Sequence, residues 1–147
     1  MIKLYFKSKK DPLLEKKVPG LDILRLKCDV RFEEKSGEIW NYDAILDTGA
    51  FISLIPFSIW KNVEHEEIER HTVKGIIPGK ECSIDVIIGK IKLKLIDEEN
   101  ETGELNIYAY LAMTDEVPLI LGFKDLLSKF RVCFDYGENE AFLEEKN

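Results

Sequence analysis

One carboxylate stands where the sequence is best arranged for chemistry. Asp47 ends the apolar run 44–46 and is followed at once by Thr48, Gly49 and Ala50, before a second apolar run begins. An aspartate is rarely buried unless its carboxylate is paired or hydrogen-bonded. Gly49 has no Cβ and lets the backbone approach that carboxylate, and Thr48 adds a hydroxyl that can donate and accept. We therefore predict a carboxylate held in a dry, tight turn.

The residues around Asp47 resemble the active-site signature of the retropepsin-like aspartic proteases, the family of the retroviral proteases. The family pattern is apolar-apolar-Asp-Thr-Gly-Ala-x-x-Ser-x-apolar-Pro. This chain carries every position of the pattern, in Ile45, Leu46, Asp47, Thr48, Gly49, Ala50, Ser53, Ile55 and Pro56. An isolated Asp-Thr-Gly is weak evidence, because small polar triplets occur in any loop, and an ordinary strand-to-turn corner is the alternative interpretation.

A second element of the resembling family lies 75 positions further along the chain (122 − 47). There the apolar run 119–121 ends at Gly122 and is followed by 123–127. The family closes its core with such an apolar turn and a short helix. The two elements, in this order and at this distance, are together a strong signal of the family.

The resemblance implies a mostly β fold, a retropepsin-like closed β-barrel with one or two short helices. It implies a single domain over residues 1–147, with a core of about 21–136, an N-terminal extension at 1–20 and an acidic tail at 137–147. The activity that it implies is that of an aspartic-type endopeptidase, a hydrolase that cleaves peptide or protein substrates with water.

The number of signature aspartates predicts two chains for one active site. Carboxylate catalysis of peptide hydrolysis needs a base for the water and an acid for the carbonyl oxygen. Two carboxyls about 3 Å apart do not both ionise easily and share one proton, as in all aspartic proteases. Asp-Thr-Gly occurs once, at Asp47, and Asp-Ser-Gly does not occur. The second carboxylate must then be Asp47 of another subunit across a two-fold axis, so we expect a homodimer.

By position, the resemblance also gives roles to the neighbours of Asp47. Thr48 would link the two active-site turns through its hydroxyl, and Gly49 would donate a hydrogen bond to the catalytic carboxylate. Ala50 would pack beside the carboxylate pair and contact substrate, and Gly122 would let the apolar strand turn beneath the loop. Apolar residues before Gly122 would line substrate pockets: Val117, Leu119 and Ile120. Such walls would favour large apolar side chains beside the cut bond.

A predicted hairpin supplies the remaining candidate substrate contacts. Pro78 followed by Gly79 is the pairing typical of the two central positions of a type II turn. Before this turn lies Gly75, followed by the apolar tip Ile76 and Ile77. In the resembling family this region is the flap that closes over bound peptide, so these three residues are predicted to contact substrate. A hairpin packed against its own domain is the alternative.

Alternating polarity predicts the strands that position Asp47. Apolar and charged residues alternate over 24–32, and 39–46 returns as the strand that delivers the aspartate. Further strands are expected at 83–95, 105–112, 117–121 and 131–136, short helices at 53–61 and 123–130, and an acidic loop at 97–104. A strand end holds the carboxylate more rigidly than a loop would. In retroviral enzymes interleaved terminal strands make much of the dimer contact, but here a basic extension and an acidic tail stand in those places.

Composition excludes several other classes of function. The chain has 147 residues, of which 45% are hydrophobic and 33% charged, as expected of one globular domain. Its formal charge of −7 (21 − 28) argues against nucleic acid or a membrane as partner, because both attract basic surfaces. The basic N-terminus has no long apolar region, so it is not a secretory signal. These features favour a cytoplasmic protein.

The cysteines and histidines show no metal or redox pattern. Cys28 and Cys133 fall on the apolar phase of predicted strands, so we expect free buried thiols in a reducing compartment. His65, His71 and Cys82 lack zinc spacing, and no cofactor motif is present, so neither metal nor cofactor is expected. The remaining rival is a catalytically silent peptide-binding or dimerisation module of the same fold. The intact signature favours catalysis, because a scaffold has little use for a buried carboxylate.

Overall fold

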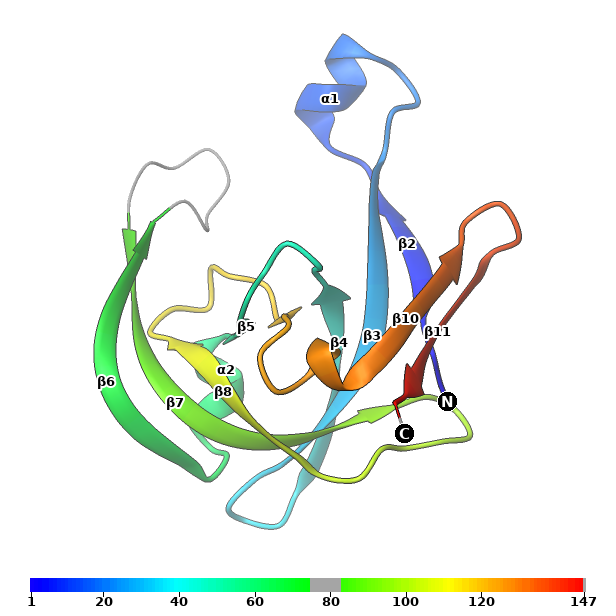
Figure 1. Ribbon diagram of the computed structural model, residues 1–147. Helices are drawn as coiled ribbons and strands as arrows, with labels where there is room; N and C mark the ends of the chain where they lie inside the picture. Colours follow the sequence, from blue (N-terminus) through cyan, green and yellow to red (C-terminus); the bar gives the residue numbers. More distant parts are fainter. Residues whose placement is uncertain (75–82, 147) are drawn as a thin grey trace.

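A computed structural model describes residues 1–74 and 83–146 of the chain (Figure 1). The protein is mostly β, with 57% of the described residues in strands and 9% in helix, which confirms the predicted fold class at this level. The helical residues form α1 (Pro12–Lys17), α2 (Phe57–Trp60) and the 3-10 turn η1 (Leu127–Lys129). Among the described residues, no helix is long and apolar enough to cross a membrane.

The larger sheet has eight strands, and an extra pairing between β3 and β7 joins six of them into a ring. In spatial order the strands are β2 (Tyr5–Lys9), β3 (Ile23–Glu33), β4 (Ile39–Leu46), β9 (Ile120–Leu121), β5 (Ser53–Ile55), β8 (Leu105–Ala112), β7 (Ser83–Ile96) and β6 (His65–Lys74). The main apolar core is built from the buried faces of these strands, with residues such as Val30, Phe32, Ile107 and Leu121.

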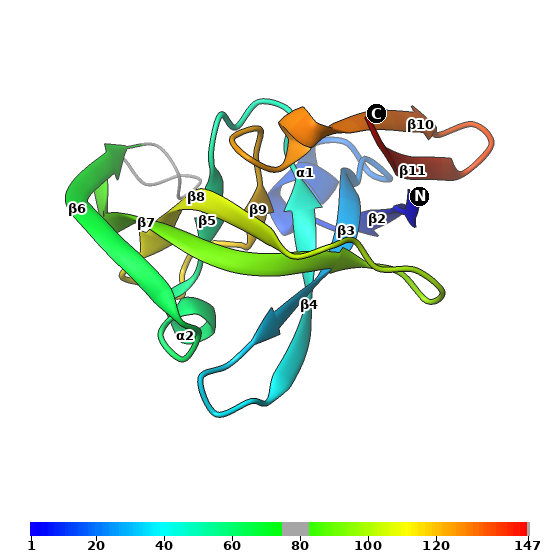
Figure 2. The ribbon, with the colours of Figure 1, turned by 60° about the horizontal axis from the view of Figure 1, so that its bottom comes forward.

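The chain ends form a second, three-stranded sheet in the order β1 (Ile2–Lys3), β11 (Glu140–Glu145) and β10 (Phe130–Asp135). Figure 2 shows both termini at one end of the molecule, away from β6. Leu4 and Leu143 are buried in the main core, so the core extends beyond the predicted range 21–136. The predicted acidic tail is therefore a packed hairpin strand whose alternate residues, Ala141 and Leu143, point inward.

Two strands match their predicted bounds, while several other elements are shorter or different. β4 lies at the expected hairpin return 39–46, and β8 lies at 105–112, where alternation predicted it. The helix expected at 53–61 begins only at Phe57, because Ser53–Ile55 pairs with β8 and β9 as strand β5. The strand expected at 117–121 is limited to Ile120–Leu121.

The helix expected at 123–130 is absent, although its apolar residues have helical spacing. Asp125 has a φ of 61°, a left-handed conformation that ends any α-helix. Its carboxylate accepts a hydrogen bond of 2.9 Å from the backbone N–H of Tyr108 on β8. The tertiary contact thus overrides local helical periodicity, and the segment makes turns and then η1.

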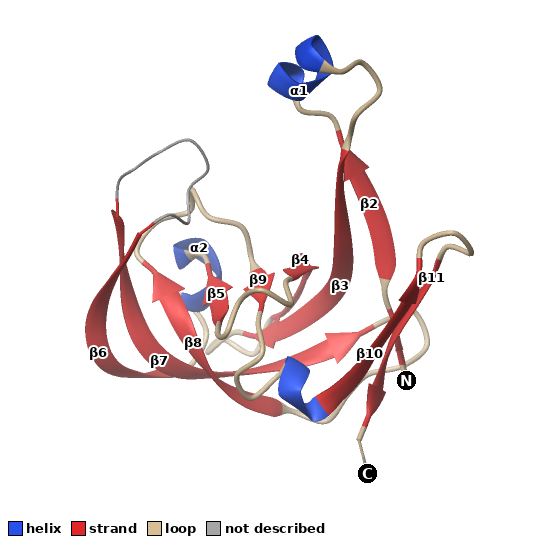
Figure 3. Ribbon diagram, turned by 45° about the horizontal axis from the view of Figure 1, so that its top comes forward, coloured by secondary structure: helices blue, strands red, loops and turns tan. Residues whose placement is uncertain are grey.

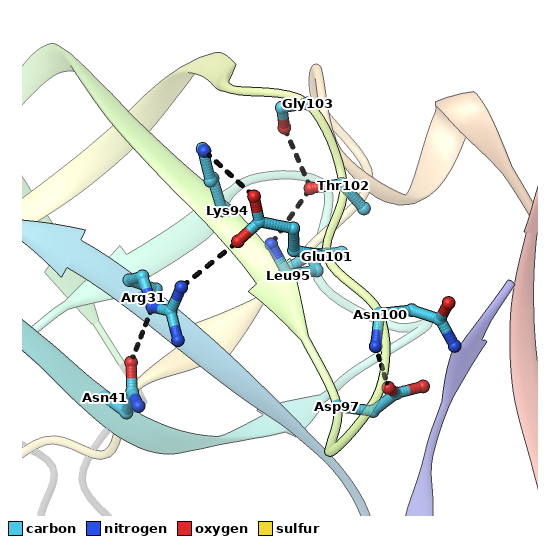
Figure 4. A network of polar contacts seen from close by, with 9 residues as sticks. All are labelled: Arg31, Asn41, Lys94, Leu95, Asp97, Asn100, Glu101, Thr102 and Gly103. Atoms are coloured by element: carbon cyan, nitrogen blue, oxygen red, sulfur yellow. Dashed lines mark hydrogen bonds and ion pairs between the residues drawn. The ribbon is translucent and has the colours of Figure 1, made fainter.

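The acidic loop after β7 is held by a polar network (Figure 4). Glu101 accepts hydrogen bonds from Arg31 on β3 at 3.1 Å and from Lys94 on β7 at 3.4 Å. Asp97 accepts the backbone N–H of Asn100 at 2.6 Å, and the buried Thr102 hydroxyl accepts the N–H of Leu95 at 3.0 Å. The loop therefore fixes the end of β7 beside β3, where the ring of strands joins.

Candidate active site

Two strands bring the two signature elements side by side. β4 and β9 pair in parallel, with Ile45 opposite Ile120 and Leu46 opposite Leu121. The N–H of Asp47 donates to the carbonyl of Leu121 at 3.0 Å, so the aspartate leaves the sheet at a fixed point. Residues 75 positions apart in the sequence therefore form one structural unit.

The turn after β4 brings the backbone onto the carboxylate of Asp47. Its Oδ1 accepts the N–H of Gly49 at 2.8 Å, as the resemblance implied. A Cβ at Gly49 would lie only 3.2 Å from the same oxygen, so the small residue permits the close approach. The turn is also joined to the Gly122 loop, because the carbonyl of Ala50 accepts the N–H of Phe123 at 3.0 Å.

Gly122 and Ser53 join the Gly122 loop to the end of the active-site loop. Gly122 is buried, and a Cβ on it would meet the carbonyl carbon and oxygen of Ile52 at 2.5 Å. Its N–H donates to the hydroxyl of Ser53 at 2.9 Å, and Ser53 is fully buried. The family signature includes Ser53, but the sequence analysis gave this residue no role. A serine inside the apolar run 51–55 was the signal that its hydroxyl is buried and needs a hydrogen-bond partner.

The site is open in a single chain, which differs from the predicted dry setting. Asp47 and Ala50 are half-buried, and Thr48 and Gly49 are exposed. The loop lies at the free end of its strands, and the described residues of one chain do not cover it. One chain thus provides a single positioned carboxylate beside an exposed threonine hydroxyl.

An apolar wall that the sequence did not reveal continues from the loop. Phe51 is 67% exposed, and its ring meets Tyr110 edge-on, with centroids 5.9 Å apart. Tyr110 in turn lies 5.7 Å from the ring of His71 on β6. Tyr110 packs with Ile120 against a second apolar cluster, made of Leu54, Ile84, Val86, Ala112 and Val117.

The structure describes the predicted pocket residues but not the predicted flap residues. Val117 and Ile120 belong to this second cluster, whereas Leu119 is buried in the main core. The predicted substrate contacts Gly75, Ile76 and Ile77 lie outside the described residues. The strands on either side, β6 and β7, pair as far as Lys74 opposite Ser83.

Other candidate sites are less suited to catalysis. Burial raises the pKa of the Cys28 thiol to about 12, which makes it a poor nucleophile at neutral pH. No metal-binding cluster of histidine, cysteine and carboxylate side chains is found among the described residues. A cavity of about 900 Å³ is lined by residues of the terminal strands and the 97–100 turn, and by none of the signature residues.

Comparison with known proteins adds no further assignment. No protein-family model matches the chain, and no match is found among the curated proteins. The residues and geometry of the Asp47 loop are therefore the basis for assigning a function.

Proposed function

We propose that this protein is a homodimeric aspartic endopeptidase with a retropepsin-like closed barrel, in which each chain contributes one Asp47. The observation that carries the proposal is the Asp47 carboxylate itself, fixed at the end of the β4–β9 pair and bonded to the N–H of Gly49 at 2.8 Å. Its half-buried state in one chain supports a site that is completed by a second copy, because a two-fold axis juxtaposes identical residues.

The proposed mechanism needs two carboxyls with one proton between them. The ionised Asp47 takes a proton from water, and the water oxygen attacks the carbonyl carbon of the peptide. The protonated Asp47 of the second copy gives its proton to the carbonyl oxygen, which forms a tetrahedral diol. One hydroxyl of the diol then gives its proton to the ionised aspartate, the protonated aspartate gives its proton to the amide nitrogen, and the C–N bond breaks. The pair then again holds one proton.

The surroundings of the loop favour apolar substrate side chains. Phe51, Tyr110 and Ile120 present partly exposed apolar surface beside Asp47, and rigid aromatic surfaces of this kind bind apolar groups well. The backbone edges of the neighbouring strands would hold an extended peptide, as strand addition does elsewhere. We therefore expect cleavage between large apolar residues.

The first test is hydrolysis of a mixed peptide set with apolar pairs, followed by mass spectrometry from acidic to neutral pH. A bell-shaped rate profile is expected, because activity needs one ionised and one protonated carboxyl in the pair. Polar peptides of equal length are the control and should be cleaved more slowly. Tight peptide binding without product at any pH would contradict the proposal and identify a catalytically silent binding module.

A further inference from the structure

The terminal strands of one chain already pair with each other. β11 lies between β1 and β10, with Leu143 opposite both Ile2 and Val132, so both of its edges are filled within one chain. The N–H of Leu4 also donates to the carbonyl of Ala141 at 2.9 Å. A second copy cannot insert a strand beside β11 without breaking these pairs, so strands of two chains do not interleave there as they do in the retroviral enzymes.

A protruding hairpin stands beside the Asp47 loop. β3 last pairs with β4 at Lys27 opposite Ile45, and residues 23–26 continue past that point with β2 as their partner. β4 ends at Leu46, so this part of β3 extends past the end of β4, from which the Asp47 loop departs. Figures 1 and 3 show this hairpin, with α1 at its tip, rising beyond the end of β4. We call residues 5–26 the arm.

The base of the arm carries an exposed apolar face. Leu24 points to the same side as Leu26, and Leu26 lies opposite Phe6 on β2. The rings of Phe134 and Tyr136 meet Phe6 edge-on, with centroids 6.4 Å and 5.1 Å away. We call three of these exposed residues the arm face: Leu24 (38% exposed), Phe134 (64%) and Tyr136 (58%).

We propose that the arm face is the contact surface for a second copy of this chain. The proposal rests on the proposed function, because the carboxylate pair requires a two-fold axis close to Asp47. A surface on the part of β3 that extends past the end of β4 would lie close to such an axis. Aromatic side chains that are already held by neighbouring rings lose little freedom on binding and are typical interface anchors.

The charge distribution supports the same partner. The arm holds six basic and three acidic residues, so its formal charge is +3. The whole chain has a formal charge of −7, so the residues outside the arm carry −10 (−7 − 3). An arm that reaches across the axis would meet an acidic body, which is electrostatically complementary. An anionic lipid surface would attract the arm but repel that body, and the arm face lies at the base of the hairpin. A second copy therefore fits better than a membrane.

Sedimentation equilibrium of the full chain tests the proposal. In the double variant Leu24→Glu/Tyr136→Glu, we expect the dimer dissociation constant to rise at least about tenfold. Peptide cleavage at low protein concentration should fall in parallel and return at high concentration. Ile39→Glu is the matched control, since Ile39 is 58% exposed at the opposite end of β4, and its effect should stay below about twofold.

The outcomes separate this inference from the proposed function. Circular dichroism checks that the variants are folded, and Phe134→Ala gives a second variant without added charge, with the same direction of change. A double variant that dimerises like the wild type, in an enzyme whose cleavage needs Asp47, would overturn the arm face alone. The arm face would also be overturned, in favour of a lipid contact, if the double variant dimerises like the wild type but no longer binds phosphatidylserine vesicles that the wild type binds. A wild type that stays monomeric while it cleaves would refute the two-chain function as well.

Discussion

Asp47→Asn is expected to abolish peptide cleavage, with a loss of at least about 10³-fold in kcat/KM. The asparagine side chain has the same shape, and its Oδ1 can still accept the N–H of Gly49. It cannot, however, take a proton from water or share a proton with a second carboxyl. The measurement is the rate of cleavage of an apolar peptide, with dimerisation and the midpoint of urea unfolding as checks on structure.

Asp43→Asn is the matched control for this variant. Asp43 lies on the same strand, four residues before Asp47, and the hydrogen bond from Lys27 keeps the pKa of its carboxyl below the ordinary value. Because Asp43 pairs with a lysine at the surface, its replacement should change cleavage by less than about twofold. Full activity in Asp47→Asn would show that this carboxylate is not catalytic.

Gly122→Ala is expected to have the largest effect on stability, with a loss of about 3 kcal/mol or more in the free energy of unfolding. The added methyl group would lie 2.5 Å from the backbone of Ile52 and 2.8 Å from the carbonyl oxygen of Ala50. Backbone atoms cannot rotate away as a side chain can, so the active-site loop and the Gly122 loop must separate. Cleavage should therefore fall together with stability, as measured by urea unfolding and by rate.

Gly103→Ala provides the control for the glycine substitution. A Cβ at Gly103 meets nothing within 4 Å, so this variant should stay within about 0.5 kcal/mol of the wild type. Equal stabilities of the Gly122 and Gly103 variants would show that the two loops are not in the contact described here.

Sequence patterns predicted the elements whose conformation depends mainly on residues adjacent in the sequence. The hairpin return expected at 39–46 and the alternation over 105–112 gave β4 and β8 with their bounds, and each strand has one face in the main core. The signature predicted the tight turn at Asp47 and its bond from Gly49, because these depend on adjacent residues. Such features need no knowledge of distant contacts.

Features that depend on distant residues were not predictable in this way. Ser53 accepts the N–H of Gly122 across 69 positions, and Asp125 leaves the helical conformation to bond Tyr108. The protrusion of the arm was not predictable because residues 23–26 continue the alternation of β3, yet Leu26 still packs against the main core while Leu24 is exposed. The predicted dry setting of Asp47 is not found in one chain, because the neighbouring Thr48 and Gly49 are exposed and Asp47 is only half-buried.

Mixing of wild-type and variant subunits shows whether one active site contains Asp47 of two chains. Wild-type and Asp47→Asn chains are combined at a fixed total concentration, left to exchange, and assayed for cleavage of an apolar peptide. If each site needs two intact aspartates, activity follows the square of the wild-type fraction, so an equal mixture keeps about one quarter of it. Activity that falls in direct proportion to the wild-type fraction would show that a single chain is sufficient and would contradict the account.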